Sequence, residues 1–144
     1  MKIRTDYVTN SSSSSYVISY SSIPEFDAET VEKYPCVQVL RPLIEAIMFC
    51  EDDYGDTTAG ETVTTIEELD NFLISERGWG EYNTIEKLIE ECDIGEGEYE
   101  AYTDEINAGH SLLFKSVGYS DTSLVGLLKE LEKCDAGIKI LFGD

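Results

Sequence analysis

The chain has 144 residues, a length typical of one domain, and its 42% hydrophobic residues supply enough apolar material for one core, which argues against wholesale disorder. Thirty acidic residues against ten basic ones leave a formal net charge of -20. No two basic residues are adjacent, so direct binding of nucleic acid is not expected, because a phosphate backbone is bound by clustered Lys and Arg.

The start of the chain lacks the features of an exported protein. After Met1–Arg4 the sequence turns polar, and no long apolar run follows anywhere, so we expect no membrane association and a cytoplasmic location. The cysteines form no C-x-x-C pair, which favours reduced core thiols over a zinc or redox site. They are Cys36, Cys50, Cys92 and Cys134.

Residues 1–22 contain the first distinctive pattern, a serine tract from Ser11 to Ser15 between two alternating segments. Residues 2–8 and 15–21 alternate like strands, so one prediction is a strand pair joined by a polar loop. A flexible low-complexity segment is an equal alternative.

The opening string M-K-I-R-T-D-Y-V-T-N-S-S-S-S-S resembles the N-terminal signature of a set of uncharacterised proteins from Firmicutes and their mobile elements. In that set Phe more often stands where Tyr7 and Tyr16 stand here. The resemblance covers about the first seventeen residues. It implies a bacterial or phage origin and no particular activity.

The next segment predicts surface structure, then a buried helix, then an acidic turn. Residues 23–35 indicate a loop or short surface helix, residues 37–39 a short strand, and residues 42–50 a helix that begins at Pro42. The turn after it is closed by glycine and contains Glu51, Asp52, Asp53, Asp56 and Gly55. Its spacing does not match a calcium-binding loop, although weak cation binding stays open.

Two helix starts follow. Thr65 and Glu68 form a capping box before an apolar stripe on residues 66–76, and Asn83 with Glu86 three residues later predicts the start of the next helix. Residues 90–105 then contain eight acids in sixteen positions, interleaved with glycine and tyrosine. This is the densest acidic segment of the chain.

The last third indicates strand, helix and strand. The strands are expected at 112–119 and 138–142, and the helix begins after Asp121 and has an apolar stripe of Leu124, Leu127, Leu128 and Leu131. A helical crossover normally joins parallel strands. The predicted fold is therefore α+β, a small mixed β-sheet with helices packed on one face, and residues 1–144 are expected to form a single domain.

Signals for catalysis are few. His110 is the only histidine, so a site with two imidazoles is excluded, and the sequence contains no nucleophile-elbow, P-loop, dinucleotide-binding or zincin motif. Carboxylates are abundant, but nothing marks one pair of them as a glycosidase acid and base. We therefore expect no enzyme, no cofactor and no metal.

The remaining signal is an acidic surface with tyrosines between the acids. Such a surface can imitate the phosphates of nucleic acid, and aromatic side chains can anchor it. The sequence thus predicts a non-enzymatic acidic binding protein for a basic protein surface, in its specific form a phage or mobile-element inhibitor that blocks the basic groove of a restriction or CRISPR nuclease. The expected contact residues are Glu51, Asp52, Asp53, Asp56, Glu96, Glu98, Tyr99, Glu100, Tyr102 and Asp104. Two alternatives stay open: an accessory protein with a merely solvated acidic face, and a substrate or docking protein that acts through its serine tract.

Overall fold

The computed structural model describes residues 13–21, 27–53, 55–78, 80–91, 93–133 and 137–143. Its contacts divide the chain into two compact units. One contains Thr62–Leu112 and is called the acidic unit; the other contains Ser12–Glu61 and Leu113–Asp144 and is called the sheet unit. The prediction of a strand at residues 2–8 lies outside the described residues, and that of a single domain stays a prediction.

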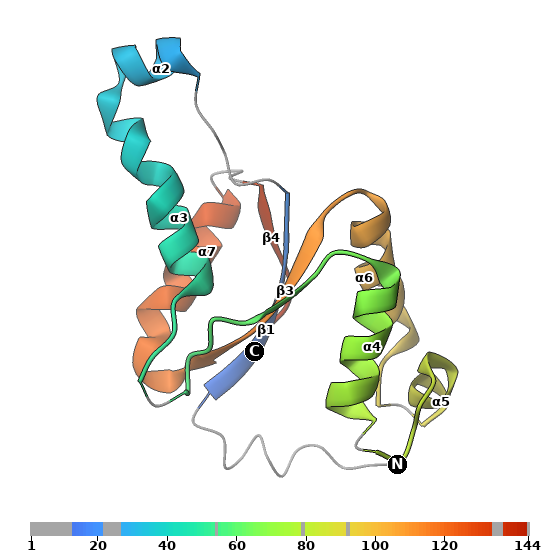
Figure 1. Ribbon diagram of the computed structural model, residues 1–144. Helices are drawn as coiled ribbons and strands as arrows, with labels where there is room; N and C mark the ends of the chain where they lie inside the picture. Colours follow the sequence, from blue (N-terminus) through green and yellow to red (C-terminus); the bar gives the residue numbers. More distant parts are fainter. Residues whose placement is uncertain are drawn as a thin grey trace. The chain divides into compact units, whose positions relative to one another are not determined.

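The strands confirm an α+β fold (Figure 1). They are β1 (Ser13–Tyr20), β2 (Glu61–Val63), β3 (Ser111–Gly118) and β4 (Ile138–Gly143), in the order β2-β3-β1-β4. β2 was not predicted, whereas β1, β3 and β4 match the predicted strands at 15–21, 112–119 and 138–142.

The sheet is antiparallel rather than mixed. β1 pairs antiparallel with β4, with Ile18 opposite Ile140 and Tyr20 opposite Ile138. The helical crossover does join β3 to β4, but β1 lies between these two strands, so they are not neighbours. Near the end of the pairing Gly143 is required, because a Cβ there would overlap the Tyr16 ring.

Two helices cover one face of this sheet, α3 (Leu40–Phe49) and α7 (Thr122–Lys133), and they contact each other. The core between them and the strands contains Tyr16, Ile18, Ile44, Ile47, Met48, Leu113, Val117, Leu124, Leu128 and Ile138. The predicted helix at 42–50 is confirmed. Leu127, expected in the stripe of α7, is 47% exposed, so it lies beside the buried stripe rather than in it.

Two short helices, separated by Tyr34, precede α3. α2 (Ala28–Lys33) begins at Asp27, whose carboxylate accepts a 2.7 Å hydrogen bond from the backbone N–H of Thr30, and η1 (Pro35–Val39) is a 3-10 helix. The strand expected at 37–39 is therefore wrong. Pro35 has its φ fixed near the helical value and lacks an N–H, which favours the first position of a helical turn.

The acidic unit is formed by α4 (Ile66–Arg77), α5 (Ile85–Glu90) and α6 (Glu96–Asn107). α4 begins as the capping box predicts, since the Glu68 N–H donates to Thr65 Oγ1 at 3.1 Å. The Glu68 carboxylate accepts from the Thr64 N–H rather than that of Thr65. α5 begins one residue later than expected, because Thr84 accepts from the Lys87 N–H and Asn83 makes no cap.

Candidate functional site

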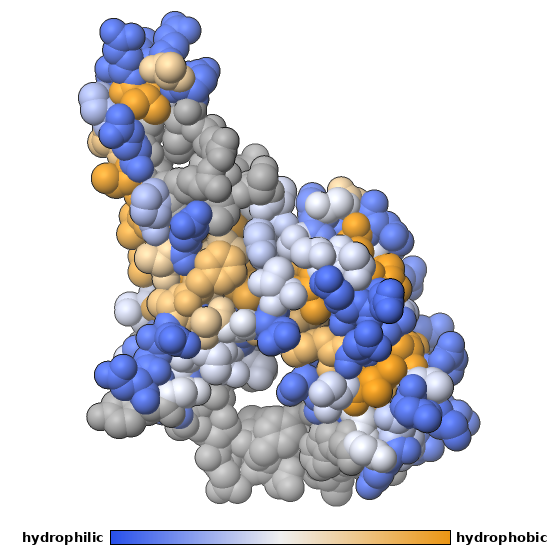
Figure 2. All heavy atoms as spheres, viewed as in Figure 1, coloured by the Kyte–Doolittle hydropathy of each residue, from blue (hydrophilic) through white to orange (hydrophobic). Residues whose placement is uncertain are grey.

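The charge of the chain is concentrated in the acidic unit. Residues 62–112 contain fourteen acidic residues against Arg77 and Lys87, a formal charge of -12 with His110 neutral. More than half of the net charge thus lies on about a third of the chain. Figure 2 shows hydrophilic side chains over α4, α5 and α6, with apolar surface visible between them.

Ten of these fourteen acids are exposed: Glu67, Glu68, Glu76, Glu81, Glu86, Glu90, Glu91, Glu96, Glu100 and Asp104. On α6 the exposed acids Glu96, Glu100 and Asp104 follow each other at i, i+4 and i+8, so they share one face at intervals of about 6 Å along the helix axis. Like charges at i, i+4 destabilise a helix. This acidic stripe (Glu96, Glu100, Asp104) is therefore stabilised by contacts on other faces of α6.

Glu98 and Tyr102 lie on the opposite face of α6 and hold it in place. The Arg77 guanidinium contacts both carboxylate oxygens of Glu98, at 3.0 and 2.8 Å, and the Tyr102 hydroxyl donates to Glu98 at 2.6 Å. The Tyr102 side chain is 0% exposed, and its burial and its bond to Glu98 raise its pKa above the usual value. Tyr102 is therefore buried inside the unit and not available as the contact residue that the sequence predicts. Glu98 is half-buried with both oxygens bonded inside the unit, and its role as a contact residue stays a prediction.

Tyr99 joins α6 to α4. Its hydroxyl donates to Asp70 at 2.6 Å, and its side chain is half-buried. Burial and the neighbouring Asp70 carboxylate raise the pKa of Tyr99 to about 12. Tyr99 can still present part of its ring to a partner, but its removal would also break an internal bond.

His110 is likewise used inside the acidic unit. Its Nδ1 lies 2.7 Å from the Glu105 carboxylate, and the ring is 39% exposed. Glu105 is the better buried member of the pair. The single histidine therefore connects the end of α6 to the start of β3. This arrangement is structural, and the chain has no second imidazole to pair with His110 in a site.

The acidic turn at 51–56 belongs to the sheet unit, so the two predicted contact clusters lie in different units. Asp52 closes this turn: its carboxylate accepts from the Thr57 N–H at 3.1 Å, and its own N–H donates to the Thr57 carbonyl at 2.9 Å. Glu51 and Asp53 are exposed, and Asp56 is half-buried. Only Glu51 and Asp53 thus remain as open acidic contacts here.

Lys115 is a buried charged residue in the otherwise apolar strand β3. It lies between Leu113 and Val117 on the core side of β3, and its Nζ donates to the carbonyls of Cys50, at 2.6 Å, and Thr58. Cys50 caps the C-terminus of α3, where a positive charge is favourable. Burial lowers the pKa of Lys115, and the nearby Cys50, Glu51 and Asp121 oppose that shift. A lysine amid four apolar neighbours was the signal that could have revealed it.

The cysteine prediction is corrected in part. Cys36 is exposed rather than a core thiol, and Cys50 is half-buried with its thiol directed at the Ile47 carbonyl. Cys92 and Cys134 lie outside the described residues.

Comparison with protein-family models, curated proteins and solved structures finds no match for this chain. Within the described ranges, no group of three His, Cys, Asp or Glu side chains is arranged to hold a metal ion. None of the helices in that part of the chain combines the length and apolar character that a membrane span requires.

Proposed function

We propose that this protein is a non-enzymatic acidic binding protein, and that its acidic unit occupies a basic groove of a nucleic-acid-processing enzyme in place of the phosphate backbone. The main support is the arrangement of acids on α6. Glu98 and Glu105 have partners inside the unit, whereas Glu96, Glu100 and Asp104 are exposed on the opposite face of the helix.

The acidic stripe of α6 has the properties that such a partner would recognise. Glu96, Glu100 and Asp104 lie on one helix whose opposite face is fixed by the buried Tyr102. These charges are therefore already ordered before a partner binds. Exposed charges of one sign accelerate the encounter with an oppositely charged groove. The partly buried ring of Tyr99 adds an aromatic contact that charge alone does not supply.

In the specific form of this proposal the partner is a defence nuclease and the protein is a phage or mobile-element inhibitor. The test measures cleavage of a cognate DNA duplex by a panel of bacterial restriction and RNA-guided nucleases, with and without this protein. Polyglutamate of the same net charge is the matched control, because it has the acidity without the fold. We expect at least one nuclease to be inhibited about tenfold or more beyond the polyglutamate effect, which corresponds to about 1.4 kcal/mol of binding specific to the folded surface. Equal effects of protein and polyglutamate across the panel would contradict the proposal and leave only a solvated acidic face.

A further inference from the structure

The strand β4 lies at one end of the strand order, so no described strand pairs with its outer side. Such an edge can pair with a strand of another molecule, and folded proteins protect it by short strands, local twist or charged side chains. The opposite edge is protected by its length, since β2 has only three residues. β4 has six residues, and its sequence I-K-I-L-F-G contains one charge and no proline. Short apolar strands of this kind associate when their edge is open.

One backbone group on the outer side of β4 is occupied by a side chain. The Ile140 N–H donates to Glu132 Oε2 at 2.6 Å. The Gly137 carbonyl accepts from the Ser21 N–H at 2.9 Å, so Gly137 faces β1. Backbone groups alternate in direction along a strand, so Ile140, three residues later, faces away from β1. The Glu132 carboxylate therefore takes the place that the carbonyl of a further strand would occupy.

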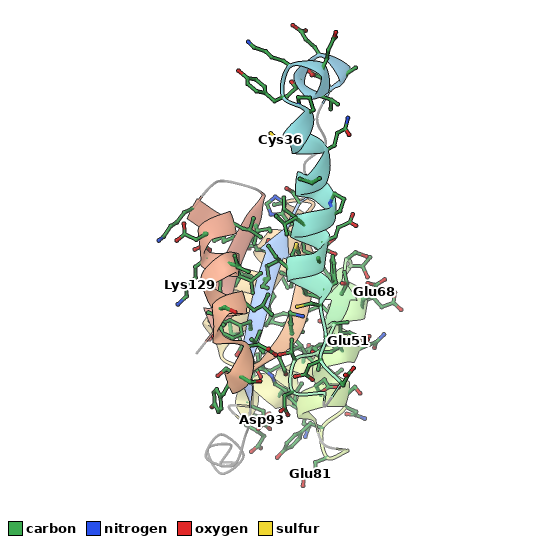
Figure 3. All side chains as sticks on the ribbon, turned by 90° about the vertical axis from the view of Figure 1, so that its left-hand side faces the viewer. Cys36, Glu51, Glu68, Glu81, Asp93 and Lys129 are labelled. Atoms are coloured by element: carbon green, nitrogen blue, oxygen red, sulfur yellow. The ribbon has the colours of Figure 1, made fainter. Side chains whose placement is uncertain are left out.

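Glu132 reaches β4 from the helix that precedes this strand. It lies near the end of α7, which packs against β4, and Figure 3 shows this helix in front of the strands with Lys129 pointing outward. Glu132 is exposed, and a hydrogen bond from a backbone N–H to a carboxylate is shorter and stronger than one between neutral groups. The carbonyl of an incoming strand would meet this carboxylate, and two acceptors cannot bond to each other.

We infer that Glu132 protects the β4 edge against pairing with the β4 edge of a second copy. The second copy presents the same apolar strand, whereas its other edge, β2, is too short to extend the sheet. The net charge of -20 adds a general repulsion that weakens at high salt, but the bond from Glu132 to Ile140 acts at the strand itself. This protection does not involve the acidic stripe of α6, because β4 and α7 belong to the sheet unit.

Sedimentation velocity at about 1 M salt, where repulsion between the chains is screened, tests this inference. We expect wild type to keep the monomer mass of 16.1 kDa and Glu132→Ala to exceed it increasingly as protein concentration rises. Glu130→Ala is the matched control, because Glu130 is an exposed acid of the same helix whose loss changes the net charge equally, and it should stay monomeric. Glu132→Gln should also stay monomeric, since its amide oxygen can still accept from the Ile140 N–H.

Amide hydrogen exchange identifies the surface through which Glu132→Ala associates. The Ile140 amide of this variant should exchange about tenfold faster than in wild type when dilute, and regain protection as protein concentration rises. A monomeric Glu132→Ala would overturn the inference, and so would association that leaves the Ile140 amide unprotected, because the contact would then lie elsewhere. If circular dichroism shows Glu132→Ala unfolded, Glu132→Asp replaces it with the same expected result, because its carboxylate keeps the charge but is too short to reach Ile140.

Discussion

The guanidinium of Arg77 in α4 and the carboxylate of Glu98 in α6 form a two-pronged ion pair, with contacts of 3.0 and 2.8 Å. Arg77 also donates to the Asp93 carbonyl at 3.4 Å. The planar fork of arginine matches both carboxylate oxygens, which lysine cannot do. In a unit of fourteen acids this pair connects two helices and neutralises a carboxylate that is mostly buried.

Arg77→Met is therefore expected to destabilise the protein, whereas Lys87→Met is not. Both substitutions remove one of the two cations of the acidic unit, so the net charge changes equally, but Lys87 is exposed. We expect Arg77→Met to lower the free energy of unfolding by an amount between two limits. A surface ion pair contributes about 0–1 kcal/mol, and breaking a buried pair costs about 3–5 kcal/mol. Urea unfolding measures both. Equal losses would mean that total charge, rather than this pair, is what matters.

Alkaline pH should weaken the acidic unit through its tyrosines. Tyr102 and Tyr99 have pKa values raised in the folded state, Tyr99 to about 12, so the folded protein binds more protons than the unfolded chain. Their contribution is complete below the unfolded tyrosine pKa of about 10 and is lost as pH rises through the folded values.

Thermal melts from pH 8 to 12 of wild type and Tyr102→Phe check this. The variant keeps the ring in place but lacks the ionisable hydroxyl, so its stability should fall less steeply above pH 10. Lys115 has the opposite effect, because its pKa is lowered in the folded state, so stability increases as pH rises toward the lysine pKa of the unfolded chain. Both proteins contain Lys115, so its effect cancels in the comparison. Parallel pH profiles for the two proteins would contradict the assignment.

The core of the sheet unit predicts a contrast between neighbouring leucines of α7. Leu128 is 0% exposed, so Leu128→Ala should cost about 2–5 kcal/mol through lost burial and the cavity left behind. Leu127→Ala should stay within about 0.5 kcal/mol of wild type, as surface substitutions do. Chemical unfolding of both variants measures these changes in stability. A loss at Leu127 as large as at Leu128 would mean that α7 presents a different face to the sheet.

Lys115→Met should destabilise the loop that follows α3. The substitution leaves the carbonyls of Cys50 and Thr58 without their donor, and a buried polar group without a partner costs about 1–3 kcal/mol. The substitution also removes a buried ammonium group, whose desolvation is costly, and this offsets part of the lost stability. Lys129→Met is the exposed control. Amide hydrogen exchange should show faster exchange at residues 50–60 in Lys115→Met alone, and unchanged exchange there would exclude the lysine as the support of this loop.

Much of the local structure could be predicted from the sequence, because its causes are local. The Thr65 cap, the apolar spacing of α4 and the leucines of α7 each depend on residues within a few turns. The insertion of β1 between β3 and β4 could not be predicted, since it depends on pairing between the two ends of the chain. A strand-helix-strand pattern alone indicates the relative direction of the two strands, but not whether they are neighbours in the sheet.

The candidate site was predicted in outline and not in detail. The density of acids indicated the α6 segment, but not which acids face outward. Glu98 is turned inward by Arg77, twenty-one positions earlier in the chain, and Tyr102 follows Glu98 by one helical turn. The spacing of Tyr99, Tyr102 and Ile106 is that of a helical apolar face, and it was the available signal that this segment is a packed helix.

The central claim is that the acidic stripe of α6 binds a basic groove, and association kinetics test it most directly. Surface plasmon resonance across a salt series compares wild type with Glu96→Lys, Glu100→Lys and Asp104→Lys combined, on an immobilised nuclease that the protein inhibits. The matched control reverses three exposed acids of the sheet unit, Glu29, Glu32 and Glu61, with the same change in net charge. The account predicts that the stripe variant associates at least about tenfold more slowly than this control and loses most of its salt dependence, because steering depends on charges facing the groove. Equal association rates for the two triple variants would contradict it.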